Sequence, residues 1–116
     1  MKIREMISKG EPTVSFEIFP PKSSYALETV FDTLTELKDL HPDFISVTYG
    51  AGGTAQSNTV EIASRIKKDF GIESIAHLTG CTSTKEGMKR TLTSIKDSGI
   101  ENILALRGDI PQEKLA

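Results

Sequence analysis

The stretch DFGIESIAHLTG, residues 69–80, decides the fold, because its pattern recurs 28 residues later as DSGIENILALRGD, residues 97–109. Both copies begin with D-x-G-I-E-x-I, continue as an apolar segment typical of a β-strand, and end in polar residues. A weaker copy, DLHPDFISVTYG, occupies residues 39–50. A unit of about 30 residues has the length of one strand, one helix and two short loops. The repeat therefore predicts consecutive βα units and a parallel sheet.

A further strand is predicted ahead of the repeat, in the segment VSFEIFPP, residues 14–21. Aligning the four segments brings Pro20, Gly50, Gly80 and Gly108 to equivalent positions, directly after each strand. Glycine at such a position lets the chain turn sharply or lets a ligand approach the backbone. Because the carboxyl ends of parallel strands meet at one edge of the sheet, we expect the polar residues there to surround one ligand.

The predicted elements alternate along the chain. Strands are expected at residues 13–19, 44–48, 74–78 and 102–106, after a short leading helix at residues 2–9. Helices are expected from Ser23 or Ser24 to Leu40, from Thr54 to Phe70, and from a capping box that begins at Ser83. Gly71 and Gly99 are each expected to end a helix in the left-handed conformation.

The length of the chain limits the fold. Eight βα units of this size need roughly 250 residues to close a barrel, whereas this chain has 116 residues. We therefore interpret it as the first half of a (β/α)8 TIM barrel, with four parallel strands and three intervening helices. On this interpretation residues 1–116 form one incomplete, truncated domain. A complete small open-sheet α/β domain is the competing interpretation.

Composition and charge exclude several classes of function. The formal net charge of −2 gives no electrostatic reason to expect nucleic acid or an anionic membrane. No apolar run approaches the roughly 20 residues that span a bilayer, and the N-terminal residues lack the apolar core of a signal peptide. The single cysteine, Cys81, excludes an internal disulfide framework and suits a reducing compartment. A cytoplasmic protein is expected.

Glu17 is the most informative single residue, because it lies within a predicted strand, opposite the apolar face, where an unpaired carboxylate is costly to bury. In the register of the repeat, Glu17 falls level with Val47, His77 and Ala105. Alternate strands of a β/α barrel fill the same interior layer, so Glu17 and His77 are expected to meet. Two interpretations stay open: a structural carboxylate satisfied by a histidine, or a general acid.

Three other features are weaker signals. The segment Arg107–Gly108–Asp109 suits a local ion pair, or a polar clamp for an anionic or carbonyl group and a developing cation. The loop GAGGT, residues 50–54, could hold phosphate ahead of a helix, but it matches neither the Rossmann nor the P-loop motif. Cys81 has no adjacent base and is expected to be a structural thiol. One histidine near the strand ends gives no support for a metal site.

Four short sequence motifs together resemble the N-terminal part of proteins of the methylenetetrahydrofolate reductase family. They are SFEIFPPK at 15–22, FISVTYGAGG at 44–53, AHLTG at 76–80 and LALRGD at 104–109. They occur in family order and with family-like spacing across nearly the whole chain. The resemblance implies a flavin-dependent (β/α)8 barrel. In that family FAD takes a hydride from NADH or NADPH and passes it to 5,10-methylenetetrahydrofolate, giving 5-methyltetrahydrofolate.

The resemblance also implies roles for individual residues. Glu17 is expected to be the general acid that protonates the folate and helps to open its methylene bridge. Asp109 is expected to face the folate and to stabilise the cationic iminium. Contacts with the flavin or the nicotinamide are expected from Thr48, Tyr49, Ala51, His77, Arg107, Gly108 and Asp109.

Two functional hypotheses follow. The first is an enzyme, a homo-oligomer in its intact form, of which these residues supply half of the catalytic barrel. Later strands supply much of the FAD site in the family, so the 116 residues alone are expected neither to retain FAD nor to turn over. The second is a stand-alone half-barrel that acts as a non-catalytic binding or assembly module through its exposed sheet edges. The sequence leaves open the preference between NADH and NADPH.

Overall fold

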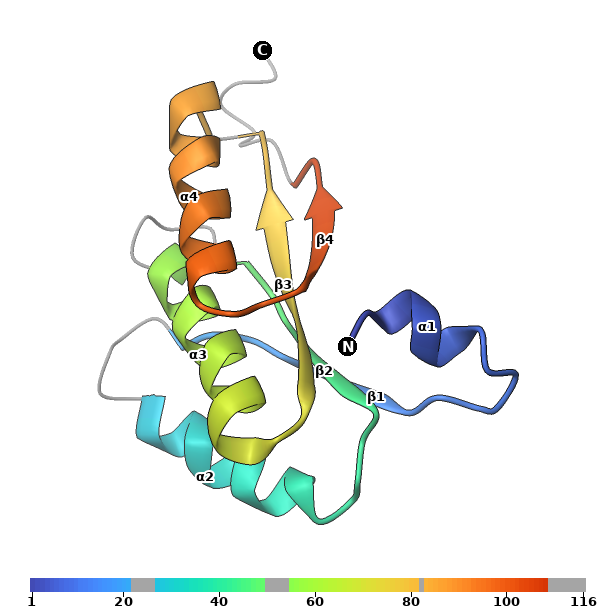
Figure 1. The fold of residues 1–116 in the computed structure, drawn as a ribbon. Coiled ribbons are helices and arrows are strands. Elements are labelled where there is room, and N and C mark those ends of the chain that lie inside the picture. Colours follow the sequence, from blue (N-terminus) through green and yellow to red (C-terminus); the bar gives the residue numbers. More distant parts are fainter. Residues whose placement is uncertain (22–26, 50–54, 82, 109–116) are drawn as a thin grey trace.

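The computed structural model describes residues 1–21, 27–49, 55–81 and 83–108. Helices and strands alternate along this part of the chain (Figure 1). The elements are α1 (Ile3–Ile7), β1 (Ser15–Ile18), α2 (Leu27–Lys38), β2 (Phe44–Val47), α3 (Ala55–Phe70), β3 (Glu73–Thr79), α4 (Lys85–Asp97) and β4 (Asn102–Leu106). The predicted caps at Ser23, Ser24 and Thr54 lie outside the described residues.

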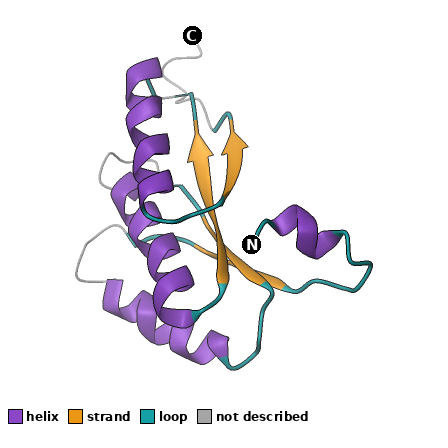
Figure 2. Ribbon diagram, in the orientation of Figure 1, coloured by secondary structure: helices purple, strands orange, loops and turns teal. Residues whose placement is uncertain are grey.

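The four strands form one parallel sheet in the order β1-β2-β3-β4. Helices α2, α3 and α4 lie together against one face of this sheet, while the short helix α1 lies on the other side (Figure 2). A doubly wound sheet would reverse its strand order and carry helices of its crossovers on both faces. The sequential order and the single helical layer are instead those of the first half of a (β/α)8 barrel. None of the described helices is long and apolar enough to cross a membrane.

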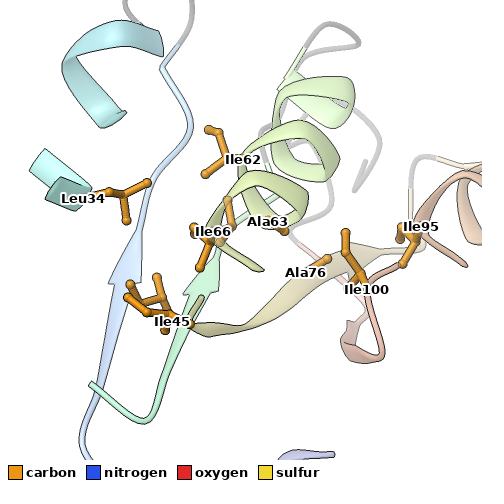
Figure 3. Close-up of a cluster of buried hydrophobic side chains, with 10 residues drawn as sticks. Leu34, Ile45, Ile62, Ala63, Ile66, Ala76, Ile95 and Ile100 are labelled. Carbon is orange, nitrogen blue, oxygen red and sulfur yellow. The ribbon is translucent and has the colours of Figure 1, made fainter. Parts of the chain in front are cut away.

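The hydrophobic core fills the space between the three helices and the sheet (Figure 3). The spacing of residues in α3 predicts a buried stripe of Thr59, Ile62, Ala63, Ile66 and Phe70. The first four are almost completely buried, and Phe70 is partly buried against the core. The other members of this core cluster come from α2, β2, β3, α4 and the turn after α4, namely Leu34, Ile45, Val47, Ala76, Ile95 and Ile100. Each large aliphatic side chain buried in this way contributes about 1.5–3 kcal/mol to folding.

The helical spacing of apolar residues predicts that Leu40 and Leu92 face the core, but both are exposed. Leu40 is 65% exposed, because α2 ends at Lys38 and the helical stripe does not reach it. In α4 Leu92 is 40% exposed, and the neighbouring Thr91 takes the buried position. The error at Leu92 shows that a pattern of apolar residues fixes the inward face of a helix only to within one residue.

The left-handed helix ends predicted at Gly71 and Gly99 are confirmed, with φ of 66° and 81°. At the end of α4, the N–H of Gly99 donates to the carbonyl of Lys96 at 3.0 Å, and the N–H of Ile100 donates to that of Ile95 at 3.3 Å. This pair of bonds is the Schellman motif. His41 holds the equivalent position after α2 with φ of 52°, so the turns after α2, α3 and α4 each contain one residue in the left-handed region.

The N-cap of α4 is Thr84, one residue later than the capping box at Ser83 predicted. The Thr84 hydroxyl accepts a hydrogen bond from the N–H of Gly87 at 3.0 Å. The N–H of Ser83 donates to the carbonyl of Gly80 at 3.2 Å, so Ser83 belongs to a turn ahead of the helix. The helix therefore starts with one capping bond and without the reciprocal glutamate contact of a full box.

A cluster of charged groups ties the N-terminus to the amino ends of β3 and β4. The Met1 ammonium pairs with Glu73 and lies 3.5 Å from Glu101. The Lys67 ammonium of α3 bridges the same two carboxylates, at 3.2 Å and 2.8 Å. Asn102 completes the cluster by donating to the Met1 carbonyl and to Glu73. Because only 8% of the Glu73 side chain is exposed, its charge depends on these partners.

Candidate active site at the carboxyl end of the sheet

The sheet face opposite the three helices, here called the inner face, carries the candidate site. Side chains alternate between the two faces of a strand, and the ladder pairs Glu17 with Ser46 and Ser46 with Ile75. The same register places the following described residues on the inner face: Ser15, Glu17, Phe44, Ser46, Glu73, Ile75, His77, Thr79, Asn102, Leu104 and Leu106.

Glu17 and His77 meet on the inner face, as the sequence predicted. The His77 Nε2 atom lies 3.5 Å from Glu17 Oε1. The Glu17 side chain is 51% exposed, whereas that of His77 is only 9% exposed. Val47 and Ala105, which the repeat put at the same level, point to the opposite face.

The stagger of the strands explains why Glu17 contacts His77 and not a residue directly across the ladder. Following the ladder from Glu17 leads through Ser46 to Ile75, two residues before His77 in β3. The contact is thus displaced by two residues over two strands. A shift of about one residue per strand is what closure of an eight-stranded barrel with shear of about eight requires.

The imidazole of His77 is not fully satisfied within the described residues. Its Nε2 atom is buried and has no hydrogen-bond partner there, since the contact with Glu17 lies at the long limit for such a bond. An unpaired buried polar atom costs about 1–3 kcal/mol. Such an atom, aimed at a carboxylate near the strand ends, is typical of a binding or catalytic site.

Ser46 is a third member of this group and was not predicted from the sequence. Its hydroxyl donates to Glu17 Oε1 at 3.5 Å, the same oxygen that faces His77. The alignment of the repeats had placed Val47 beside Glu17. The ladder register puts Ser46 there instead, because neighbouring strands are paired one residue out of step with the alignment.

Thr48 and Tyr49 follow β2 and are held by its neighbours. The N–H of Thr48 donates to the carbonyl of Ile18 at 2.9 Å, and its carbonyl accepts from the Thr59 hydroxyl at 2.8 Å. Burial raises the pKa of the Tyr49 phenol above its ordinary value of 10.0, and a hydrogen bond with Ser83 opposes part of this shift. The Tyr49 phenol is therefore a protonated donor at neutral pH.

The chain turns sharply after β4. Backbone pairing between the chains that follow β3 and β4 continues beyond the two strands, since the N–H of Cys81 donates to the carbonyl of Arg107 at 2.8 Å. Gly108 has φ of 85°, and a Cβ atom there would lie 2.8 Å from the Cβ of Thr79. Only glycine fits this position, whether or not a ligand approaches it. The Arg107 side chain is exposed and donates to the Gly108 carbonyl at 3.3 Å.

The structure thus places six of the eight expected site residues at the carboxyl ends of parallel strands. These six are Glu17, Thr48, Tyr49, His77, Arg107 and Gly108. The other two, Ala51 and Asp109, lie outside the described residues, as does any ion pair between Asp109 and Arg107. Of the six, only Glu17 and His77 are brought into side-chain contact in the described part of the chain.

A separate pocket lies at the other end of the sheet, between α1 and β4. Its lining combines cations with apolar side chains: Lys2, Ile3, Arg4, Ile75, Glu101, Asn102, Ile103 and Leu104. It adjoins the amino ends of β3 and β4 and includes none of the expected site residues. In the described residues there is also no group of three or more His, Cys, Asp or Glu side chains placed to hold a metal ion.

Comparison with known proteins indicates the same family as the four sequence motifs. A family model described as methylenetetrahydrofolate reductase matches residues 2–116. The chain is 41% identical over 105 residues to the 5,10-methylenetetrahydrofolate reductase of Pectobacterium carotovorum, and 38% identical over 103 residues to that of Escherichia coli. It is 39% identical over 110 residues to methylenetetrahydrofolate reductase (NADH) 1 of Arabidopsis thaliana.

These matches cover most of this chain but a minor part of each relative. They include 90% of the chain for the Pectobacterium protein, 89% for the Escherichia protein and 95% for the Arabidopsis protein. The chain spans only 35% of the length of the two bacterial relatives and 19% of the plant relative.

Proposed function

Because the chain belongs to the methylenetetrahydrofolate reductase family, we propose that the full-length protein reduces 5,10-methylenetetrahydrofolate to 5-methyltetrahydrofolate. NADH or NADPH would be the source of the hydride and FAD its carrier. The names of the relatives state the reductase activity for those proteins, and the plant name specifies NADH. The observation that carries the proposal is Glu17, a half-exposed strand carboxylate in contact with a buried histidine near the carboxyl ends of the strands.

In this proposal Glu17 acts as the general acid. Its O–H bond breaks and the proton passes to a nitrogen of the methylene bridge. The adjacent C–N bond breaks with its electron pair on that nitrogen, which leaves an iminium cation on the folate and a carboxylate on Glu17. Asp109 is proposed to stabilise the iminium charge. With 51% of its side chain exposed on the inner face, Glu17 is open to a substrate from that side.

The described residues near the strand ends suit a flavin ring, whose edge presents carbonyl oxygens and nitrogens. They offer three donors: the protonated phenol of Tyr49, the exposed guanidinium of Arg107 and the buried imidazole of His77. Bound FAD would supply hydride transfer at this position. Thr48, Ala51, Gly108 and Asp109 are proposed as further contacts with the flavin or the nicotinamide.

We also propose that residues 1–116 are the N-terminal half of the catalytic barrel. The two bacterial relatives are about two and a half times as long as this chain, which leaves room for the remaining strands. At β4, Ile103, Leu104 and Leu106 are each 40–44% exposed and would be covered by the next βα unit. A cytoplasmic homo-oligomer stays a prediction.

The same exposed residues of β4 support the second candidate, a non-catalytic half-barrel that assembles through its free edge. Size-exclusion chromatography with light scattering on residues 1–116 tests it. A stable folded dimer would favour the assembly module, whereas aggregation or an unfolded chain would favour an incomplete barrel.

The proposed function is tested on the purified full-length protein. We expect bound yellow flavin, NAD(P)H oxidation and reduction of methylenetetrahydrofolate. Glu17→Gln should lower the folate-dependent rate by about 10²–10⁴-fold, since it removes the acid, and should leave reduction of the flavin by NAD(P)H intact. Glu28→Gln, on the exposed side of α2, is the matched control. A colourless protein, or a fully active Glu17→Gln variant, would contradict the proposal.

A further inference from the structure

We propose that Ser46 is a positioning residue for Glu17. Together with His77 it fixes the carboxyl oxygen Oε1, so that the other oxygen, Oε2, carries and releases the proton. The inference rests on the proposed function, because it takes Glu17 to be the general acid. Ser46 lies directly beside Glu17 in the ladder of β1 and β2, on the same face of the sheet.

Two polar groups converge on one oxygen of Glu17. The Ser46 hydroxyl donates to Oε1 at 3.5 Å, and His77 Nε2 lies 3.5 Å from the same atom. Among the described residues, no hydrogen bond or ion pair involves Oε2. Donors directed at one oxygen of a carboxylate favour negative charge there. The proton of the neutral acid is therefore left to Oε2.

The burial of His77 is an independent observation that supports a functional group made of Glu17, Ser46 and His77. Only 9% of its side chain is exposed, and Nε2 has no hydrogen-bond partner in the described residues. Leaving a buried nitrogen unpaired is costly unless the pairing forms at another stage of the reaction. Hydrogen bonds to a charged carboxylate are shorter than those to a neutral one. Both 3.5 Å contacts would shorten when the proton leaves Glu17, which stabilises the product of the transfer.

Few other charged groups can compete for Glu17. Among the described strand residues of the inner face, the titratable ones besides Glu17 are His77 and Glu73, both from β3. Lys2 and Arg4, at the start of α1, reach this face as well, where they line a pocket with Ile75 and Leu104 towards the amino ends of the strands. Glu73 lies at the amino end of β3, where Lys67 and the Met1 ammonium neutralise it. Strands β1, β2 and β4 contribute no other charged side chain to the described part of this face.

The test is Ser46→Ala in the full-length holoenzyme, with the two half-reactions followed separately by stopped-flow absorbance. Folate-dependent reoxidation of the flavin should slow roughly three- to tenfold, the effect of one hydrogen bond. Its rate should fall off at a higher pH than in the wild type, because the carboxylate loses a donor that favoured the charged form. Reduction of the flavin by NAD(P)H should be unchanged.

Three variants separate positioning from a general loss of stability. Ser46→Thr keeps a hydroxyl and should restore the pH profile. Ser74→Ala removes the hydroxyl of a fully buried strand serine, which donates to the Ala63 carbonyl at 2.8 Å on the helix side, and should keep the wild-type profile. In a Glu17→Gln background, Ser46→Ala should cause no further loss, because its effect passes through Glu17.

A readout that needs no turnover distinguishes failure of the inference from failure of the proposed function. Isotope-edited infrared spectroscopy follows protonation of the Glu17 carboxyl, whose titration midpoint should move to higher pH in Ser46→Ala. An unchanged midpoint, or fully additive losses in the double variant, would overturn the positioning role even in an active reductase. A shifted midpoint in a protein that cannot reduce methylenetetrahydrofolate would support the positioning role and refute the reductase proposal.

Discussion

His41 occupies a backbone position that the repeat otherwise gives to glycine. The three equivalent residues His41, Gly71 and Gly99 have φ of 52°, 66° and 81°. A side chain in this left-handed region clashes with the following carbonyl, at a cost of roughly 1–2 kcal/mol that glycine avoids. In this turn the protein therefore tolerates local strain.

Exchange of glycine and side chain at these turns should change stability in opposite directions. His41→Gly should stabilise the full-length protein by roughly 0.5–1 kcal/mol after allowing for the greater freedom of glycine in the unfolded chain. Gly71→Ala should destabilise it by about 1 kcal/mol, although the added Cβ meets no atom within 4 Å. Urea unfolding measures both changes.

Asp39→Gly is the control for His41→Gly, because Asp39 precedes the same turn and does not have a positive φ. Glycine there should destabilise the protein. Equal stabilisation by both substitutions would rule out relief of left-handed strain as the cause.

For single residues, the sequence predicted the contact between Glu17 and His77 but not which residue lies beside Glu17 in the neighbouring strand. The meeting of Glu17 and His77 followed from the layer rule of β/α barrels and is confirmed. Ser46 was missed because alignment of repeats carries no information on the hydrogen-bonded register between strands. The chemical roles of Glu17 and of the cofactor contacts stay predictions, since they rest on resemblance.

Among the elements, α4 offers a sharp test of its first turn. Thr84→Ala should lower the free energy of unfolding by about 1 kcal/mol, because the N–H of Gly87 loses its acceptor. Thr84→Ser keeps a hydroxyl and should cost much less. Circular dichroism during thermal unfolding of the full-length protein measures the difference.

Ser83→Ala distinguishes the observed cap from the predicted one. It should cost less helix stability than Thr84→Ala, because Ser83 lies outside the capping bond. A larger loss from Ser83→Ala than from Thr84→Ala in a Tyr49→Phe background, which removes the hydrogen bond between Tyr49 and Ser83, would restore the original capping box.

The order and type of the elements were predictable because each has a strong periodic pattern. The 3.6-residue stripe of buried residues indicated the position of α3, and the glycines at 71 and 99 indicated where α3 and α4 end. Element ends were less predictable, since they depend on pairing partners: β1 is shorter than expected, Ser15–Ile18, and β3 is longer, Glu73–Thr79. The N-cap of α4 was predicted one residue too early, at Ser83, which lies in the turn that follows Gly80.

For the whole molecule, the charged cluster at the amino ends of β3 and β4 predicts how stability depends on pH. The hydrogen bond with Glu73 raises the pKa of the Met1 ammonium above 8.0, so its contribution is complete below pH 8.0 and is lost as the pH rises further. The hydrogen bond from Lys67 lowers the pKa of Glu101 below 4.5, so that contribution is lost as the pH falls below 4.5.

Glu101→Gln isolates this dependence from the rest of the protein. The stability difference between wild type and variant should be largest between pH 4.5 and pH 8.0 and shrink on both sides. Glu61→Gln, an exposed carboxylate of α3 with no ion pair among the described residues, should give a flat difference. A flat curve for Glu101→Gln as well would show that the cluster contributes nothing to folding.

The same cluster has a practical consequence for recombinant work. A purification tag fused ahead of Met1 would convert its ammonium into a neutral amide and leave Lys67 as the only cation paired with Glu73 among the described residues. Protein prepared in that way should melt earlier than protein that begins at Met1, and measurements on it would understate the thermal stability of the untagged molecule. An affinity handle at the opposite terminus avoids this artefact.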